Sequence, residues 1–282
     1  MPLRYSIRRK DGNLVKTITT IEQSEHMTAT YQRFGEGAPL VLLHAFPLNQ
    51  SMWQPQIAVL GHQYTVIAID YAGFGRSTWE PRGTPGAHDI DDVAQSITAV
   101  LDELDIERAA VAGLSMGGYV ALALWRIAPQ RVDRLAICNS RASADDEATK
   151  QARSRNAAMV LEQGAEALAD AMLPRLLSQH AGTGMRRHVH TLAASAQPRV
   201  SANALLMMRE RPDATPLLPQ ITVPTLVVGA SDDPIIPAHE SLQMATALPN
   251  GNAVIIAESG HLSNLERPDV FNRALRDWMR MP

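Results

Sequence analysis

Six short apolar runs, each continuous rather than alternating with polar residues, most constrain how this chain can fold. Strands that are buried on both faces of a parallel sheet have this pattern, because helices cover both sides of such a sheet. Between two of the runs, residues 88–106 place apolar side chains on one helical face, with Asp89 as the N-cap. This alternation predicts an α/β fold with a mostly parallel, doubly wound sheet. The runs are residues 40–46, 65–71, 109–115, 134–140, 224–230 and 252–258.

The interval from residue 142 to residue 219 interrupts the alternation of strand and helix. It contains no convincing strand and three helical patterns, so we expect a helical cap inserted after the sixth strand. The core is then expected to comprise residues 27–141 and 220–282. Residues 1–26 hold two β-leaning runs around Asp11-Gly12, and they are expected to form an edge hairpin or a dispensable extension.

Composition excludes several classes of function. With 26 Lys plus Arg against 29 Asp plus Glu, the net charge of −3 offers no basic footprint for nucleic acid. The single cysteine, Cys138, excludes an intramolecular disulfide and multi-cysteine zinc sites. The chain shows neither a signal-peptide pattern nor an apolar stretch long enough to span a membrane. We therefore expect a cytoplasmic protein with a small-molecule substrate and no nucleic-acid or membrane partner; a homo-oligomer is left open.

The stretch Gly113-Leu-Ser115-Met-Gly117 lies between a predicted strand and a predicted helix. The pattern G-x-S-x-G in that context predicts a sharp turn, in which the glycines permit close packing and the serine hydroxyl projects above the sheet. The N–H of Met116 and the positive end of the helix would then face whatever the serine attacks.

A serine nucleophile needs a base and an orienting acid, and the C-terminal part of the chain offers both. His261 follows the last predicted strand, and Asp232 and Asp233 follow the strand before it. The order of serine, aspartate and histidine is that of an α/β hydrolase. Other histidines fit less well, because they lie in another loop or in the helical interval, and no metal site is expected. They are His44, His180, His188 and His190.

Four separated motifs carry a family resemblance. They are HAFPLNQSMW, DYAGFGRS, GLSMGG, and VPTLVVGASDDPIIP together with ESGHLSNLERP. From about residue 27 to the C-terminus, the chain resembles the α/β-hydrolase superfamily. Within it, the chain looks most like the 3-oxoadipate enol-lactonases and the related small bacterial carboxylesterases.

The resemblance implies roles for individual residues. Ser115 matches the nucleophile and His261 the general base, while Phe46 matches the oxyanion-loop residue whose N–H joins that of Met116. Ala45 departs from the His-Gly that family members commonly have, and His44 matches a residue that supports the loop.

Two ways of counting residues after the strand select different aspartates as the acid that orients His261. The family's spacing and its D-x-x-x-P ending select Asp233, which we favour, whereas counting three residues from Gly229 selects Asp232.

The resulting hypothesis is a serine hydrolase that cleaves a small ester or lactone through an acyl-enzyme, without a cofactor. Cofactor-free haloperoxidases (perhydrolases) and carbon–carbon bond hydrolases share the same elbow, and a ligand sensor with slow turnover is an alternative of another class.

The cap is expected to determine which substrate the enzyme accepts. Its methionines could line an adaptable apolar pocket, and Arg141, Arg153 and Arg155 could meet a substrate carboxylate, although ordinary helix packing and exposed charge are the commoner cases. The methionines are Met159, Met172, Met185, Met207 and Met208.

Overall fold

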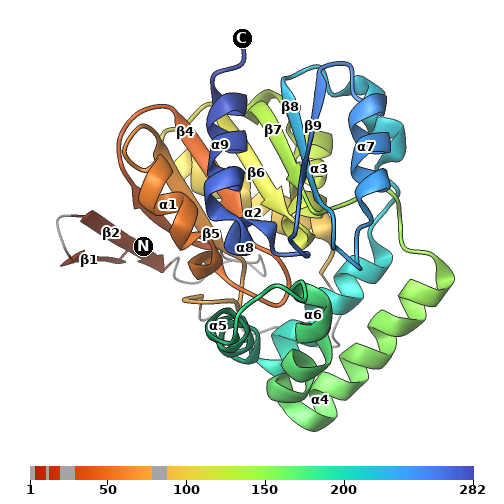
Figure 1. The fold of residues 1–282 in the computed structure, drawn as a ribbon. Helices are drawn as coiled ribbons and strands as arrows, with labels where there is room; N and C mark the ends of the chain where they lie inside the picture. Colours follow the sequence, from red (N-terminus) through yellow and green to blue (C-terminus); the bar gives the residue numbers. More distant parts are fainter. Residues whose placement is uncertain (1–3, 11–12, 20–28, 78–87) are drawn as a thin grey trace.

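The computed structural model describes residues 4–10, 13–19, 29–77 and 88–282. Within them, seven strands form one sheet in the order β3-β5-β4-β6-β7-β8-β9 (Figure 1). Strand β3 pairs antiparallel with β5, and every other neighbouring pair is parallel. The mostly parallel sheet predicted from the apolar runs is thus confirmed. The strands are β3 (Thr30–Phe34), β4 (Pro39–Leu43), β5 (Thr65–Asp70), β6 (Ala109–Leu114), β7 (Val132–Cys138), β8 (Thr225–Ala230) and β9 (Gly251–Ile256).

Helices cover both faces of this sheet, as the continuous apolar runs require. Alternate residues of β4 show the division: Val41 and Leu43 join a core with α2, α3 and α7, whereas Leu40 and Leu42 join a core with α1 and α9. Each of these four side chains is fully buried. The helices are α1 (Gln54–Leu60), α2 (Ile90–Glu103), α3 (Met116–Ile127), α7 (Ala238–Ala247) and α9 (Pro268–Met279), with the single turn α8 (Ser263–Glu266) before α9.

Helix α2 begins where the sequence predicted. The side chain of Asp89 accepts hydrogen bonds from the N–H groups of Asp91 and Asp92, and the side chain of Asp92 accepts one from the N–H of Asp89. This capping box satisfies amides that would otherwise lack a partner. The apolar face that the periodicity defines is buried along the helix, from Ile90 to Leu101.

Three further helices lie together beyond one end of the sheet, in the segment between β7 and β8 that we call the cap (Figure 1). They are α4 (Glu147–Leu176), α5 (Thr183–Ala194) and α6 (Pro198–Glu210). Strand β7 is the strand counted as sixth from the sequence; its number is higher by one because β3 was not among the runs recognised there. Gly164, at φ 87°, breaks α4 into the two helical patterns seen in the sequence. Helix α5 was not anticipated, because its histidines and arginines leave a short apolar pattern.

The two ends of the cap meet at its base. The N–H of Ala214 donates to the carbonyl of Ala142 at 2.8 Å. Beside this bond, the buried carboxylate of Asp145 pairs with Arg153, on α4, and with Arg211, directly after α6. The Arg211 guanidinium also lies 4.0 Å from the ring centre of Tyr119 on α3, so the base of the cap contacts the core.

At the N-terminus, β1 (Arg4–Lys10) and β2 (Asn13–Thr19) pair as a separate antiparallel hairpin. The Asp11-Gly12 dipeptide and the start-like segment at Met27 lie outside the described residues. None of the helices in the described part of the chain is long and apolar enough to cross a membrane.

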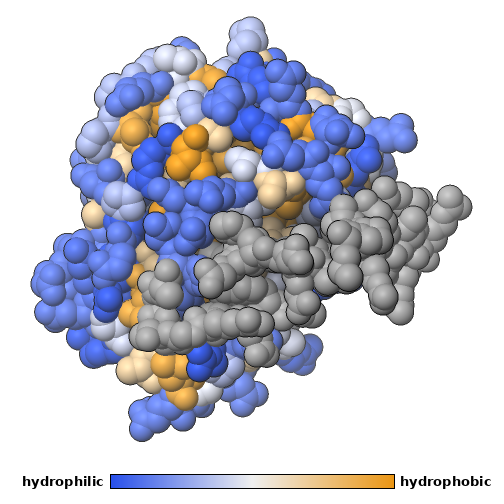
Figure 2. All heavy atoms as spheres, turned by 180° about the vertical axis from the view of Figure 1, so that it is seen from behind, coloured by the Kyte–Doolittle hydropathy of each residue, from blue (hydrophilic) through white to orange (hydrophobic). Residues whose placement is uncertain are grey.

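Figure 2 shows the molecule from behind, where hydrophilic side chains separate small apolar spots on the described surface. Within residues 29–77 and 88–282, the large apolar side chains that are exposed belong to four different helices. They are Val59, Leu161, Leu242 and Val270.

Candidate active site

Ser115 occupies the turn between β6 and α3 in a strained conformation. Its φ of 55° and ψ of −114° are unusual for any residue other than glycine. The surroundings hold it there: its N–H donates to the carbonyl of Cys138 at 2.9 Å, and its carbonyl accepts from the hydroxyl of Ser140 at 2.8 Å. The turn therefore projects a serine side chain at the carboxyl end of the sheet, as the G-x-S-x-G pattern predicts.

Gly113 and Gly117, on either side of Ser115, have no room for a side chain. A Cβ on Gly113 would lie 2.1 Å from the carbonyl oxygen of Gly117, and a Cβ on Gly117 would lie 2.2 Å from that of Leu43. Real Cβ atoms do not approach backbone this closely. The second contact also shows that the end of β4 lies directly against the first turn of α3.

This close approach brings the loop after β4 to the elbow. Phe46 in that loop and Met116 at the start of α3 are both buried. In the described part of the chain, neither backbone N–H has a hydrogen-bond partner. Buried amides without a partner beside a serine are the donors that an oxyanion would use.

His44 supports the loop after β4 through hydrogen bonds, as the resemblance implied. Its Nδ1 donates to the carbonyl of Ala45 at 3.0 Å, and its Nε2 accepts from the N–H of Tyr71 at 3.3 Å. Burial lowers the pKa of His44 to about 4, although Asp70 and the Ala45 carbonyl act in the opposite direction. The imidazole is therefore neutral near pH 7 and joins the loops after β4 and β5.

The buried neutral His44 predicts a pH dependence of stability. Because its pKa falls from 6.5 to about 4 on folding, its contribution is fully present above pH 6.5 and is lost as the pH falls toward 4. The loss amounts to roughly 3 kcal/mol. Urea unfolding at pH 7 and pH 4 should therefore show a larger drop in stability for the natural protein than for His44→Gln. Equal drops in the two proteins would contradict this assignment.

Asp233, rather than Asp232, contacts His261. His261 lies between β9 and α8 with only 1% of its surface exposed, and its Nδ1 is 2.8 Å from Oδ2 of Asp233. The side chain of Asp232 turns the other way: it accepts from the hydroxyl of Ser231 and lies 3.5 Å from Nε2 of His180 on the cap. The spacing used by the family thus selects the aspartate that lies beside the histidine.

The carboxylate of Asp233 is held on every side. Oδ1 accepts from the N–H groups of Ile235 at 2.8 Å and Ile236 at 3.0 Å, and Oδ2 accepts from the amide of Asn139 at 3.0 Å as well as from His261. Burial alone would raise the pKa of Asp233, but the charge and hydrogen bond of His261, with the bonds from Asn139 and Ile236, lower it overall. The group is therefore ionised near neutral pH and fixes the orientation of the imidazole.

Asn139 was missed from the sequence. It follows β7 at φ 44°, donates to Asp233, and accepts a hydrogen bond of 2.6 Å from the hydroxyl of Ser263 on α8. The only signal was its place at the carboxyl end of a buried strand, where polar side chains of parallel sheets gather.

The structure brings Ser115, Asp233 and His261 to the same edge of the sheet without joining all three. No hydrogen bond links the Ser115 hydroxyl to His261 in the residues that the structure covers. Catalytic hydrogen bonds are often long in free enzymes and tighten with substrate. Among the described residues, no group of three or more His, Cys, Asp or Glu could hold a metal ion.

An apolar cavity lies between Met116 and the cap. Tyr71 and Phe74 line it from the loop after β5, and Met207 lines it from α6. Met207 is the one methionine of the five considered that lines this cavity; Met208, one residue on, contacts Arg153 instead. The arginines considered for a substrate carboxylate are engaged or exposed: Arg141 pairs with Glu240, Arg153 with Asp145, and Arg155 is exposed.

Several known proteins are similar to this chain over most of its length. A protein of Serratia proteamaculans (strain 568), provisionally assigned as a carbamate hydrolase, is 30% identical over 81% of this chain and 86% of its own length. 3-Oxoadipate enol-lactonase 2 of Acinetobacter baylyi (strain ATCC 33305 / BD413 / ADP1) is 29% identical over 91% of this chain and 95% of its own. The structure of a thermophilic esterase from Thermogutta terrifontis superposes with a TM-score of 0.86 at 31% identity, covering 99% of this chain and 98% of that one.

The family comparison covers most of the core and the whole cap. The family described as the alpha/beta hydrolase fold matches residues 38–268, which include the loop after β4, the elbow and both residues of the Asp233–His261 pair. The relatives named above are a hydrolase, a lactonase and an esterase. From its fold, its elbow and these relatives, the chain belongs to the α/β-hydrolase family and is an enzyme of that family.

Proposed function

We propose that this protein is a serine hydrolase that cleaves a small carboxylic ester or lactone through an acyl-enzyme. The observation that carries the proposal is the buried pair of His261 and Asp233, 2.8 Å apart, at the sheet edge where the elbow presents Ser115. A lone serine is a weak nucleophile, and an oriented imidazole is what activates it. The two unpartnered amides of Phe46 and Met116 support the same reaction, because an ester carbonyl gains negative charge when it is attacked.

In the first half of the reaction, Oγ of Ser115 bonds to the substrate carbonyl carbon and Nε2 of His261 takes the hydroxyl proton. The carbonyl electrons move to oxygen, and the N–H groups of Phe46 and Met116 stabilise this oxyanion. The ionised Asp233 keeps the proton on Nδ1 and stabilises the imidazolium. When the oxyanion collapses, the bond to the alkoxy group breaks, and His261 returns the proton to that leaving group.

In the second half, water replaces the alcohol. His261 takes a proton from the water, whose oxygen bonds to the acyl carbon, and the same two amides hold the second oxyanion. Collapse breaks the bond to Ser115, and the imidazolium returns the proton to Oγ. The carboxylic acid leaves, and for a lactone substrate the alcohol and the acid belong to one molecule.

A panel of aryl esters of increasing acyl length, together with simple lactones, tests the proposal. We expect steady turnover of at least one member and a covalent adduct of a serine-directed phosphonate on Ser115, mapped by mass spectrometry. The absence of both would refute the proposal. Release of about one equivalent of product followed by a stall would instead indicate the slow sensor, since an enzyme of median rate turns over about ten times per second.

Met207 should select for the acyl length. Met207→Ala is expected to enlarge the cavity beside Met116 and to raise kcat/KM for a long acyl ester over that for an acetate by about tenfold, since each methylene in an apolar pocket is worth 10- to 200-fold. Met208→Ala is the matched control, because Met208 is equally buried on the same helix but does not line the cavity. Equal shifts in both variants would contradict this role for Met207.

A further inference from the structure

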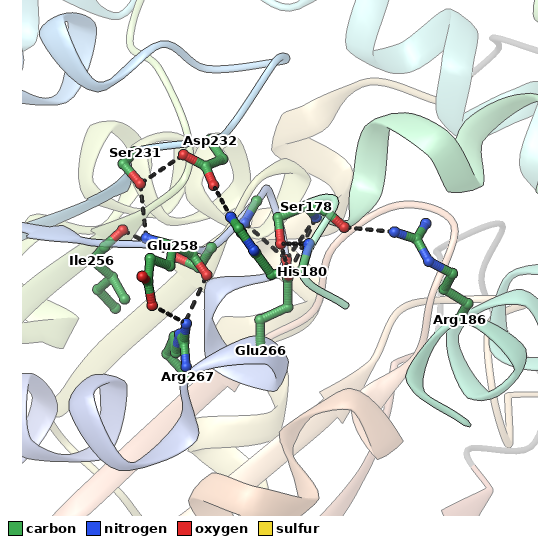
Figure 3. Close-up of polar contacts among 11 residues, drawn as sticks. Ser178, His180, Arg186, Ser231, Asp232, Ile256, Glu258, Glu266 and Arg267 are labelled. Carbon is green, nitrogen blue, oxygen red and sulfur yellow. Dashed lines mark hydrogen bonds and ion pairs between the residues drawn. The ribbon is translucent and has the colours of Figure 1, made fainter. Parts of the chain in front are cut away.

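The carboxylate of Glu266, at the end of α8, is bound by backbone and hydroxyl donors from two separate segments. Oε1 accepts from the N–H of Gly260 at 2.8 Å. Both oxygens accept from the N–H of Ser178, at 3.2 and 3.1 Å, and Oε2 also accepts from the Ser178 hydroxyl at 2.5 Å. Figure 3 shows Glu266 reaching to Ser178, which follows α4 in the cap. One side chain therefore joins the cap to the loop that carries His261.

Glu266 does not act as one half of an ion pair. The neighbouring cations have other partners: Arg267 pairs with Glu258, and Arg186 donates to the carbonyl of Ser178 (Figure 3). Arg186 also donates to the carbonyl of Ala181. In the part of the chain that the structure describes, Glu266 forms no salt bridge. Its acceptor capacity is used on amides of the two segments, and hydrogen bonds to a charged acceptor are the stronger kind.

The two segments that Glu266 joins are in direct contact. A Cβ on Gly260 would lie 2.5 Å from the nitrogen of Ser178, so only glycine fits. On the other side of His261, the N–H of Leu262 donates to the carbonyl of Leu176 at 3.1 Å. The residues immediately before and after His261 are thus both tied to the segment that ends α4.

The same cap segment also contacts the loop of the acid. His180, two residues after Ser178, lies 3.5 Å from Asp232, whose own N–H donates to the carbonyl of Ser259 at 3.0 Å. The segment that ends α4 therefore contacts both the loop that carries His261 and Asp232, the residue before Asp233.

We propose that Glu266 is a positioning residue, which fixes the backbone on the N-terminal side of His261 against the end of α4 and so places the imidazole for the attack by Ser115. The inference rests on the serine-hydrolase function proposed above. His261 lies on a loop, and a loop residue needs such supports to keep a catalytic geometry, since a displacement of about 1 Å can cost about 100-fold in rate.

Glu266→Gln tests the role, because it keeps the size of the side chain while placing an NH₂ group where an oxygen faces N–H donors. We expect kcat per active site to fall about 10- to 100-fold, with KM within about twofold. The number of active sites is counted by titration with a serine-directed phosphonate. Glu258→Gln is the matched control, since it makes the same change two residues before Gly260 on an exposed side chain paired with Arg267, and it should retain kcat.

Ser178→Ala is a milder second variant for the case in which Glu266→Gln does not fold. It removes one of the hydrogen bonds to Glu266 and keeps those of the Gly260 and Ser178 amides, so we expect a fall of about threefold in kcat per site. Glu266→Asp, which keeps the acceptors on a shorter arm, should recover part of the loss seen with glutamine.

Two results would overturn the proposal. A purely structural Glu266 would lower the melting temperature or the titrated fraction of active protein and leave kcat per site unchanged in both Glu266→Gln and Ser178→Ala. An equal fall in Glu258→Gln would show that charge, not position, matters. Failure of the serine-hydrolase proposal itself is distinguishable, since the natural protein would then neither turn over esters nor label at Ser115.

Discussion

Replacing Ser115 with alanine is expected to lower kcat by roughly 10⁴- to 10⁶-fold and to leave the fold intact. The change removes one hydroxyl whose oxygen makes no hydrogen bond within the described residues, so nothing buried is left without a partner. The backbone bonds that hold the strained elbow, from Ser115 N–H to Cys138 and from Ser140 to the Ser115 carbonyl, do not involve that hydroxyl. The measurement is ester turnover together with a thermal melt.

Ser195→Ala provides the control for the nucleophile. Ser195 is an exposed serine after α5, and its hydroxyl donates to the local carbonyl of Leu192, so activity should be retained. Undiminished turnover in Ser115→Ala, after repurification to exclude a contaminating esterase, would remove the central claim.

The second large loss of activity is expected on replacing Asp233, the acid that contacts His261. Asp233→Asn should lower kcat by roughly 10⁴-fold with little change in KM, because the acid orients the imidazole and stabilises its charged form. An amide at this position has one acceptor oxygen in place of two, while the surroundings supply four donors: two N–H groups after Asp233, the Asn139 amide and His261. Steady-state kinetics at saturating ester measure the loss directly.

Asp232→Asn is the matched comparison for the acid. Its carboxylate faces Ser231 and His180 on the outer side of the loop, so we expect a loss of less than about tenfold from a weak and partly screened field. The reverse ranking of the two variants would make Asp232 the acid. Mild losses in both would mean that neither aspartate orients His261.

Much of the fold could be predicted because its signals are local. Unalternating apolar runs marked the parallel strands, and Asp89 marked the start of α2. Since parallel strands end at one edge, the residues that follow them, Ser115, Asp233 and His261, were expected at that edge, where the structure has them. The choice of Asp233 also had a local basis: its carboxylate caps the N–H groups two and three residues later, a turn that Asp commonly forms.

The supports of the site could not be predicted in the same way. Asn139 contacts a residue 94 positions later, and Glu266 contacts one 88 positions earlier. Such contacts leave no period or spacing in the sequence, because they depend on which loops the completed sheet brings together. Helix α5 was missed for another reason: its inner face is held by few apolar residues, with Val189 and Ala193 buried.

The hydrogen bond between the two ends of the cap has a consequence for exchanging caps between enzymes of this family. Because the Ala214 amide bonds to the Ala142 carbonyl, the chain leaves the core and returns to it at one point. When the two ends of a segment are already in contact, lengthening the segment adds little to the loop-closure entropy lost on folding. We therefore expect residues 143–213 to be exchangeable as a unit. Because Asp145, Arg153 and Arg211 all lie inside this segment, an exchange removes the buried ion pairs together and leaves no unpaired charge in the core. The graft would still have to supply an equivalent of Ser178, which binds Glu266.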